Sequence, residues 1–472
     1  MLAFSPRRLA HGLGARIVQT GPEADFTAVG TDTRSLERGA LFVALEGKRP
    51  GESFFGDALA VGARALAGRS FTPKVRREAR RRGAFLFAVP DGLEALQALA
   101  ADQRRLLACP VIAVTGSNGK TSTKDMLAHL LGGGPEVLAT KGNFNNHLGV
   151  PLTLLRARPG LEAAVVEAGM NHPGELTALG RLIRPDVALE LNVGDAHCGH
   201  FSGGRAGVAA AKEELLTAMG PSGIAVVNAD DPLTAAMGRR FRGRVASFGT
   251  AKSADLRLKV TVDRGAGGLR AVAQWNAPFG GRPRSLAVAL AQGGPARRAQ
   301  VSAALAAALV LGGDARELEG RLAAWRPSGA MRQELRRIPL KGGKACAILD
   351  AYNASPQSMA AALAFLELSA PKGRRTAVLG CMLELGEAAP ELHRALGREA
   401  RARGVDRLAA LGVHAPEVVR GFGGNAAAAF EAGDVEGAAA FVRAGLKSGD
   451  WCLFKGSRGL AVERVFQALL GA

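Results

Sequence analysis

Residues 111–127 have the types and the spacing that would hold a polyphosphate. The run VIAVTGSNGKTSTKDML predicts a buried strand, a turn with Gly116 and Gly119, and a helix that Lys120 and Thr121 open. Backbone N–H groups in such a turn, with the positive end of the helix, can surround phosphate oxygens; the lysine can reach the outer phosphates and the threonine hydroxyl can ligate magnesium. We therefore predict a site for ATP or another nucleoside triphosphate. The residues predicted to form it are Thr115, Gly116, Ser117, Asn118, Gly119, Lys120, Thr121 and Ser122.

Three segments beyond this loop contain residues that we consider as metal ligands. In AAVVEAGMNHPGEL a buried strand ends on Glu167, and a carboxylate at the carboxyl end of a parallel strand points into the crevice where such sheets bind ligands. It could ligate Mg²⁺ opposite the triphosphate. A second strand is followed by a loop with His197 in the segment DVALELNVGDAHCGHF. Lys212 lies in the next predicted helix, AGVAAAKEELL. A lone histidine is more often a core or surface residue and a helical lysine is ordinarily solvated, so the residues alone favour a metal role only for Glu167.

The elements that would position these residues form three successive α/β units. The chain has 472 residues, which is too long for one core, and its 47% hydrophobic and 22% charged residues are typical of globular proteins. In the first unit LFVAL predicts a strand and FGDALAVGARAL (residues 55–66) an amphipathic helix. From Cys109 onward, alternating strands and helices predict a parallel, doubly wound sheet.

The third unit begins near Pro327, after a segment, LAAWRPSGAMRQE, that could serve as a hinge. Its strand candidates are ACAILDAY, RTAVLGCM, DRLAALG and DWCLFKG, and alanine-rich stretches with helical apolar spacing, such as residues 423–445, separate them. We predict a parallel α/β sheet here as well.

The net charge of +19 admits a nucleic-acid-binding protein, because clustered Lys and Arg release counterions from a phosphate backbone. Much of the excess is arginine in helical stretches such as VRREARRRG and REARARGV, which favours solvated faces, and anionic nucleotides offer another use for positive potential. A basic P-loop ATPase that binds nucleic acid therefore stays as an alternative, although the sequence shows no convincing basic stripe. The prediction is that no nucleic acid binds.

The absence of a long apolar run and of a signal peptide predicts a cytoplasmic protein without membrane insertion. The five scattered cysteines predict reduced thiols.

The motifs resemble those of the Mur ligase family. The compact T-G-x-x-G-K-T form of the phosphate loop is similar to that of Mur ligases and folylpolyglutamate synthases, and E-x-G, N-V-G-x-A-H and A-x-K-x-E follow in the order of a Mur ligase central domain. The resemblance implies that Glu167 and His197 bind a second Mg²⁺, with Thr121 on the first. It also implies that Lys212 corresponds to the lysine that related ligases carry as a carbamate, and that Lys120, His197 and Lys212 are catalytic. Phe201, Ser202 and Gly203 depart from the family's F-G-S.

The third unit resembles the Mur ligases that add D-alanyl-D-alanine. LDAYNASPQSM is similar to their D-Y-N-A-x-P-x-S-M motif and contains Tyr352, the one tyrosine of the chain. By resemblance, Arg332 in MRQE and Asp350 in LDAYNASPQSM are predicted to contact the nucleotide. The segment VLGCMLELGE has Cys381 where the family has aspartate. By the same resemblance, the predicted substrate-binding residues are Arg34, Ser35, Asn145, Asn146, Tyr352, Asn353, Lys455 and Ser457.

The resemblance implies an α/β fold of three domains: a small N-terminal domain that binds the UDP substrate (residues 1–105), a central ATP-binding P-loop domain with a parallel sheet (106–326), and a Rossmann-like C-terminal domain that binds the incoming dipeptide (327–472). It implies an enzyme that uses ATP and two Mg²⁺ ions to join D-alanyl-D-alanine to UDP-N-acetylmuramoyl-tripeptide through an acyl phosphate. We expect a monomer. The diaminopimelate- or lysine-adding Mur ligases stay as the nearest alternative, although the Asp-Asn-Pro-Arg signature of the diaminopimelate enzyme is absent.

Overall fold

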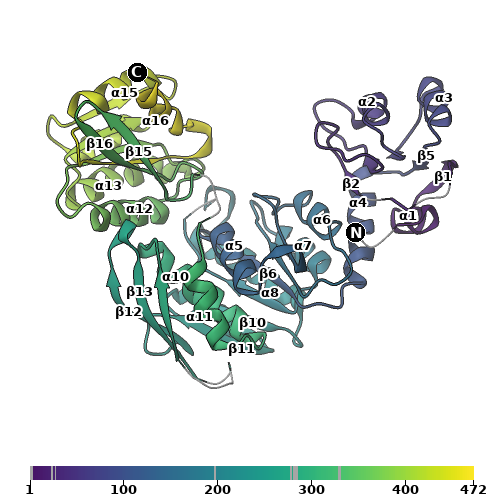
Figure 1. Cartoon of the computed structure of the whole chain (residues 1–472), viewed down its shortest axis with the longest axis horizontal. Helices are drawn as coiled ribbons and strands as arrows, with labels where there is room; N and C mark the ends of the chain where they lie inside the picture. Colours follow the sequence, from purple (N-terminus) through teal and green to yellow (C-terminus); the bar gives the residue numbers. More distant parts are fainter. Residues whose placement is uncertain are drawn as a thin grey trace.

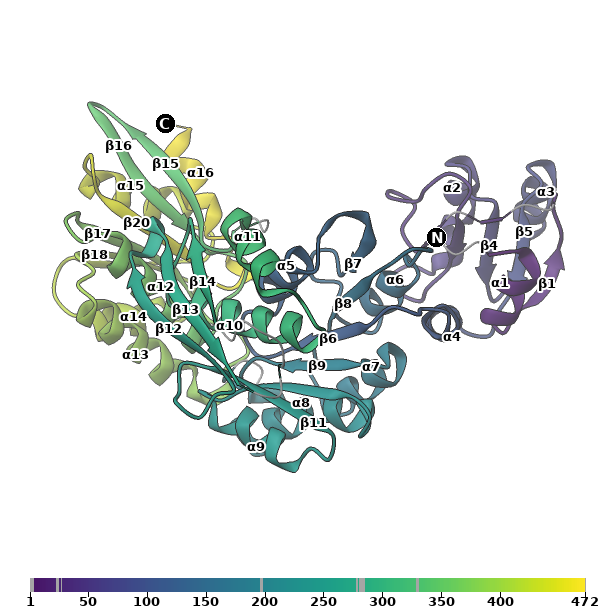
Figure 2. The same ribbon diagram turned by 60° about the horizontal axis from the view of Figure 1, so that its bottom comes forward.

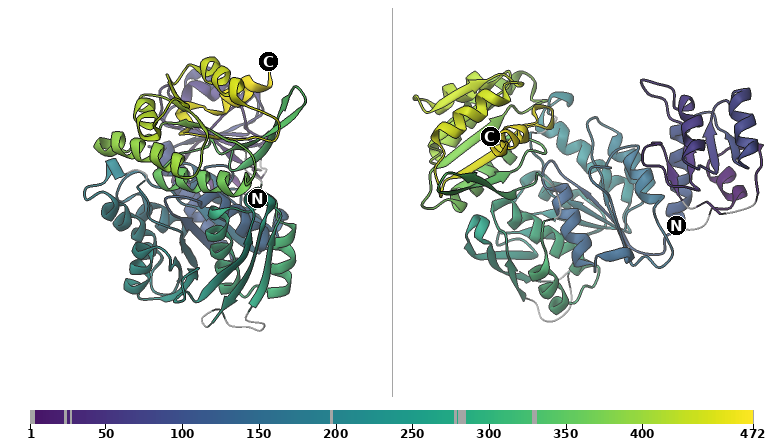
Figure 3. Two further views of the ribbon diagram at one scale, coloured as in Figure 1. Left: turned by 90° about the vertical axis from the view of Figure 1, so that its left-hand side faces the viewer. Right: turned by 45° about the horizontal axis from the view of Figure 1, so that its top comes forward.

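The chain folds around three β-sheets, one in each of the three predicted segments (Figure 1). The computed structural model describes all residues except 1–3, 23–24, 27, 196–197, 277–278, 280–284, 328–330 and 472. The N-terminal domain stands apart from the C-terminal domain, and the central domain lies between them (Figure 3, right). The exact boundaries between the domains remain predictions.

The N-terminal sheet has the order β1-β5-β4-β3-β2, with β1 antiparallel to β5 and the other pairs parallel. Its strands are β1 (Arg16–Gln19), β2 (Val29–Gly30), β3 (Leu41–Val43), β4 (Ala65–Gly68) and β5 (Phe85–Ala88). The helices are α1 (Pro6–Gly12), α2 (Phe55–Ala60), α3 (Pro73–Arg81) and α4 (Gly92–Arg105). The strand predicted at LFVAL is confirmed as β3. The helix predicted over 55–66 is wrong in its second half, because the chain turns at Gly62 (φ +98°) and Ala65 enters the buried strand β4.

The central sheet has the order β14-β13-β12-β11-β10-β9-β6-β8-β7. Its strands are β6 (Val111–Thr115), β7 (Val137–Ala139), β8 (Ala163–Glu167), β9 (Val187–Glu190), β10 (Ile224–Asn228), β11 (Arg244–Gly249), β12 (Leu256–Asp263), β13 (Leu269–Trp275) and β14 (Ser285–Leu290). The helices are α5 (Lys120–Leu130), α6 (Gly149–Leu154), α7 (Glu175–Ile183), α8 (Arg205–Met219), α9 (Pro232–Arg240), α10 (Pro295–Val310) and α11 (Ala315–Ala324). Apolar residues of α5, α10 and α11 pack on one face of the sheet, and those of α6, α7 and α8 on the other.

Parallel register brings three strand ends together at one edge of this sheet. Strand β6 lies between β8 and β9, with Val114 beside Glu167 and Thr115 beside Glu190. The predicted phosphate loop therefore begins between two acidic strand ends. This is the edge at which doubly wound sheets bind ligands.

The sequence predicted a parallel central sheet, and this is wrong for one side of it. Strands β12, β13 and β14 pair antiparallel and extend the sheet on one side. In β13 and β14 buried residues alternate with more exposed ones, which is the pattern of an antiparallel sheet with one solvated face.

The C-terminal sheet has the order β15-β16-β20-β17-β18-β19. Its strands are β15 (Glu334–Leu340), β16 (Gly343–Leu349), β17 (Arg375–Gly380), β18 (Arg407–Leu411), β19 (Ala427–Phe430) and β20 (Trp451–Lys455). The helices are α12 (Pro356–Ser369), α13 (Ala389–Ala402), α14 (Ala415–Phe422), α15 (Val435–Gly445) and α16 (Glu463–Leu470). The four predicted strands are confirmed and pair parallel. Two expectations are wrong: β15 forms an antiparallel hairpin with β16 (Figure 2), and the alanine-rich residues 427–430 form an edge strand rather than a helix.

Three smaller expectations can be compared with the described residues. The cysteines are all free thiols, as expected. No helix in the described part of the chain is long and apolar enough to span a bilayer. The arginine-rich stretches lie on α3 and α13, where several guanidinium groups pair with acids such as Glu78 and Glu391.

Candidate active site

The phosphate loop has the backbone that its glycines predict. Gly116 (φ +148°) and Gly119 (φ +84°) both adopt conformations that side chains rarely allow, and a Cβ on Gly116 would lie 2.7 Å from Leu191 Cβ. Gly119 caps the start of α5. Lys120 Nζ donates to the carbonyl of Gly116 at 2.7 Å, which keeps the side chain folded over the turn. Burial lowers the pKa of Lys120, Glu167 acts in the opposite direction, and Arg332 lowers the pKa further.

Asn192, in the loop after β9, holds the phosphate loop in place. Its side-chain oxygen accepts from Asn118 N–H at 2.9 Å, its amide donates to Asn118 O at 3.0 Å, and its own carbonyl accepts from Ser117 N–H at 3.0 Å. Gly194 N–H donates to Ser117 Oγ at 2.8 Å. Asn192 was not among the residues predicted to form the site, although it opens the N-V-G-x-A-H motif.

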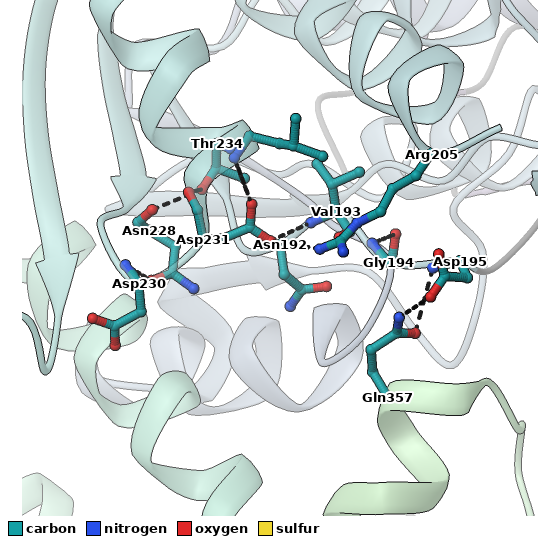
Figure 4. Close-up of polar contacts among 12 residues, drawn as sticks. Asn192, Val193, Gly194, Asp195, Arg205, Asn228, Asp230, Asp231, Thr234 and Gln357 are labelled. Atoms are coloured by element: carbon teal, nitrogen blue, oxygen red, sulfur yellow. Dashed lines mark hydrogen bonds and ion pairs between the residues drawn. The ribbon is translucent and has the colours of Figure 1, made fainter. Parts of the chain in front are cut away.

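The loop after β9 is itself fixed by Asp231 and Arg205 (Figure 4). Asp231 Oδ2 accepts from Val193 N–H at 2.9 Å, while Arg205 Nε donates to Val193 O at 2.9 Å. The other oxygen of Asp231 caps α9 through Leu233 and Thr234. The phosphate loop is therefore held by a segment that has hydrogen bonds of its own to the rest of the central domain.

Glu167 is a buried carboxylate that fits a cation. It is 1% exposed and lies on the same cavity as Thr121. Oε1 accepts from Asn145 Nδ2 at 2.8 Å, whereas Oε2 has no hydrogen-bond partner in the described part of the chain. A buried carboxylate oxygen without a partner is costly, and a divalent cation would satisfy it. Among the described residues no group of three His, Cys, Asp or Glu could hold a metal by itself. His197, the other predicted ligand, lies outside the described residues.

Lys212, on α8, lies beside an acid that the sequence analysis missed. Lys212 is 3% exposed and Glu190 is fully buried. Burial lowers the pKa of Lys212, nearby Lys120 lowers it further, and Glu190 opposes both. Burial also raises the pKa of Glu190, whose two oxygens have no hydrogen-bond partner among the described residues. Glu190 ends β9 as Glu167 ends β8, and that parallel was visible in the sequence.

A cavity of about 940 Å³ lies between the central and C-terminal domains. It contains the phosphate loop from Ser117 to Ser122, Glu167, and predicted substrate and nucleotide residues from both domains. The predicted residues that line it, beyond the loop and Glu167, are Asn145, Asn146, Arg332, Asp350, Tyr352, Asn353 and Lys455. Residues that are far apart in the sequence therefore line one cavity.

The C-terminal side of this cavity has its own polar contacts. The guanidinium of Arg332 lies over the Tyr352 ring, 3.9 Å from its centroid. Lys455 is 2% exposed, and its Nζ donates to Asp350 Oδ2 at 2.9 Å and to Asn353 O at 3.0 Å. Met331 and Gln333, on either side of Arg332, both have a left-handed backbone (φ +57°).

The first turn of α12 connects the C-terminal domain to the phosphate loop. Ser355 Oγ donates to Asn118 Oδ1 at 2.9 Å. Gln357 Nε2 donates to Asp195 Oδ2, and Asp195 N–H donates back to Gln357 Oε1 at 3.4 Å (Figure 4). Sequence reasoning missed these contacts because they join residues of different domains.

Several predicted residues do not line the cavity. Lys212 is buried behind it, and Ser457 Oγ instead accepts from Leu383 N–H at 3.1 Å. Arg34 and Ser35 lie in the N-terminal domain. Arg34 pairs with Asp32 at 2.6 Å with 88% of its side chain exposed.

Cys381, in place of the family aspartate, is a buried thiol. Its sulfur accepts from His414 N–H at 3.2 Å, and the His414 ring lies 4.6 Å from that of His393. Burial raises the pKa of Cys381, which keeps it protonated at neutral pH. It therefore cannot supply the negative charge of a carboxylate, and a nucleophilic role is not supported.

Comparisons with known proteins agree with this geometry. Residues 114–281 match the Mur ligase middle domain, and residues 336–458 match the Mur ligase, glutamate ligase domain. UDP-N-acetylmuramoyl-tripeptide--D-alanyl-D-alanine ligase of Bacillus subtilis is 34% identical over 94% of this chain and 93% of its own length. The enzyme of that name from Escherichia coli is also 34% identical, over 95% of each chain.

Solved structures show the same relationship. The structure of MurF from Acinetobacter baumannii has a TM-score of 0.86 and 30% identity, covering 100% of this chain and 99% of that one. MurF ligase from Thermotoga maritima, solved in complex with ADP, has a TM-score of 0.78 and 29% identity over 94% of this chain and 97% of that one. With the matches to both family domains and the full-length relatives, the chain belongs to the Mur ligase family, among the UDP-N-acetylmuramoyl-tripeptide--D-alanyl-D-alanine ligases.

Proposed function

We propose that the chain uses ATP to join D-alanyl-D-alanine to UDP-N-acetylmuramoyl-tripeptide, a step in building the peptidoglycan precursor. One observation carries the proposal: the phosphate loop, the buried Glu167 and the Arg332–Tyr352 pair of the C-terminal domain lie on one cavity. The relatives named as this ligase support the choice of substrates.

The reaction needs an activated acyl group, because a carboxylate does not condense with an amine in water. The terminal carboxylate of the tripeptide would attack the γ-phosphorus of ATP, breaking the bond to the β-phosphate oxygen and releasing ADP. The amine of D-alanyl-D-alanine would then attack the acyl carbon, lose a proton and expel phosphate. Lys120, half-buried and held over the turn, would offset charge on the transferring phosphoryl group.

Glu167 and Thr121 are the described residues that fit magnesium, and we propose His197 and Lys212 as further ligands of two Mg²⁺ ions. Bound magnesium would neutralise phosphate charge during transfer. Burial and Lys120 both favour the neutral amine of Lys212, which is the form that reacts with carbon dioxide. This supports a carbamate at Lys212, an anionic group that suits magnesium.

The substrate contacts divide between the domains. Asn145 and Asn146, on the cavity, would bind the sugar-peptide part of the first substrate, and Tyr352, Asn353 and Lys455 would face the dipeptide. We propose that Arg34 and Ser35 hold the UDP end from the N-terminal domain. Ser457 would act by holding the chain at Leu383 beside the dipeptide site. The cytoplasmic location and the monomeric state remain predictions.

Phosphate release from ATP tests the proposal. With UDP-N-acetylmuramoyl-tripeptide present, we expect D-alanyl-D-alanine to stimulate release and a ligated product to appear in the mass spectrum. Stimulation by diaminopimelate or lysine with the UDP-dipeptide, and none by D-alanyl-D-alanine, would instead identify the alternative Mur ligase. Stimulation by DNA or RNA alone would favour the nucleic-acid-dependent ATPase.

A further inference from the structure

A second cavity, of about 850 Å³, adjoins the active-site cavity. It lies along the edge strand β7, against α5 and the segment that follows α6. We call it the side cavity. Thr121, Arg332 and Tyr352 line both cavities, so the two border each other at the first turn of α5.

The side cavity is lined by more positive than negative charge. Asp125 is the one acid among its described lining residues, and it pairs with Lys124, whose Nζ also donates to the carbonyl of Thr140 at 2.7 Å. Four further cations line the cavity, and none of them forms an ion pair in the part of the chain that the structure describes: Lys141, Arg156, Arg158 and Arg332. Cations that are withdrawn from water without a counter-charge are costly, so an anionic ligand would stabilise this arrangement.

Two of these arginines are fixed by backbone carbonyls rather than by acids. Arg156 Nη2 donates to Ala139 O, and Arg158 Nε donates to Pro135 O at 2.9 Å, so both guanidinium groups are anchored to the residues that form and precede β7. Both residues are half-buried, and burial lowers the pKa of Arg156. The described bonds use one N–H of each guanidinium, which has five. The other donors can bind an oxyanion in the two-pronged geometry that suits carboxylate and phosphate.

We propose that the side cavity binds a small oxyanion of the reaction, held by Arg156 and Arg158 with Lys141 as a further donor. The reaction offers two such groups. One is a carboxylate on the side chain of the third peptide residue, which diaminopimelate has and lysine lacks, and the other is the phosphate expelled from the acyl phosphate. Both lie within one residue of the carboxyl group that reacts at the phosphate loop, where Thr121 borders the two cavities. The inference rests on the proposed function and adds to it an anion site outside the phosphate loop.

The two sources give different results for Arg156→Gln. If phosphate is the ligand, protein saturated with a non-hydrolysable ATP analogue, in which the phosphate loop is occupied, should bind inorganic phosphate in calorimetric titration. Arg156→Gln should then raise the Kd for phosphate about tenfold or more, since a charge-assisted hydrogen bond is lost.

If the side-chain carboxylate is the ligand, kcat/KM should be higher for the diaminopimelate tripeptide than for the lysine tripeptide, whose ammonium would meet unpaired cations. Arg156→Gln should lower this ratio about tenfold. With either source, the affinity for ADP should stay within about twofold, because Arg156 does not line the active-site cavity.

Arg242→Gln is the matched control. Arg242 is an exposed arginine that follows α9 and lines neither cavity, so its loss should change neither the Kd for phosphate nor the ratio of the two tripeptides. If Arg156→Gln does not fold, as judged by circular dichroism, the double variant Lys141→Gln/Arg158→Gln carries the test with the same two measurements.

The proposal is overturned if neither the Kd for phosphate nor the tripeptide ratio differs between the wild type and the folded variant, which includes the case of no phosphate binding by either. A wild-type preference for the lysine tripeptide without phosphate binding would overturn it as well, and so would an equal change in Arg242→Gln. These outcomes are separable from the proposed function, because stimulation of wild-type phosphate release by D-alanyl-D-alanine would stand even if the side cavity bound nothing.

Discussion

The two sides of the cavity are built in different ways. On the central side, the phosphate loop is a run of consecutive residues, fixed by bonds to Asn192 and Gly194 of the same domain. On the C-terminal side, residues reach the loop across a domain boundary, through pairs such as Ser355 with Asn118 and Gln357 with Asp195. On this division, we expect the first side to bind the nucleotide phosphates through its own residues, whereas the second contributes through contacts between the domains. Substitutions on the central side should therefore change the handling of phosphate and magnesium, whereas substitutions on the C-terminal side should lower kcat with little effect on ADP affinity.

The largest effect should come from the central side. Lys120→Ala removes the cation proposed to reach the phosphoryl group, and we expect phosphate release to fall by about 100-fold or more. Lys259→Ala, which changes an exposed lysine of β12, serves as the control and should be normal. Near-normal turnover in Lys120→Ala would remove the phosphate loop from the mechanism.

The next effect concerns the metal. Glu167→Gln keeps the shape and can keep the contact with Asn145, but it removes the charge. We expect the magnesium concentration for half-maximal activity to rise about tenfold. Glu162→Gln, at the exposed amino end of the same strand, should leave that concentration unchanged. If the magnesium requirement of Glu167→Gln equals that of the wild type, Glu167 is not a ligand.

A smaller effect should come from the C-terminal side. Gln357→Leu removes both bonds to Asp195, and we expect kcat to fall about fivefold, since two interdomain hydrogen bonds are lost. The affinity of the substrate-free enzyme for ADP should stay within about twofold, because the phosphate loop keeps Asn192. The exposed Gln467→Leu is the control. A loss of ADP affinity as large as the loss in kcat would contradict the division between the two sides.

The smallest effect should come from Arg34→Ala in the N-terminal domain, which should change stability little. Arg34 lowers the pKa of Asp32 from 3.8 to about 2, so the pair stabilises the fold above pH 3.8 and this contribution is lost as the pH falls through 2. Because both groups are exposed and solvent screens the pair, Arg34→Ala should leave the free energy of unfolding at neutral pH nearly unchanged. The KM for the UDP substrate should nevertheless rise a few-fold. An unchanged KM would leave Arg34 as a surface residue.

The sequence predicted the central side better than the C-terminal side, for a physical reason. A strand, a glycine turn and a helix opened by Lys120 are local features, and Glu167 follows from the end of a buried strand. Asn192 and Gln357 act through partners far away in the chain, so nothing in their own neighbourhood predicts those partners.

The fold shows the same limit. The parallel core was predictable from alternating strands and helices, but the antiparallel strands β12–β14 and β15 were not recognised. In β19 the alanines, which have high helix propensity, pair with β18 at the sheet edge, so tertiary pairing overrides local preference.

The left-handed backbone at Met331 and Gln333 has a consequence for Arg332, which lies between them. Each non-glycine residue in that region costs on the order of 1 kcal/mol, so neighbouring contacts have to hold the segment in place. One such contact is the hydrogen bond from Met331 N–H to Glu334 Oε2 at 3.0 Å. The position of the guanidinium over the Tyr352 ring therefore depends on backbone that only its surroundings maintain.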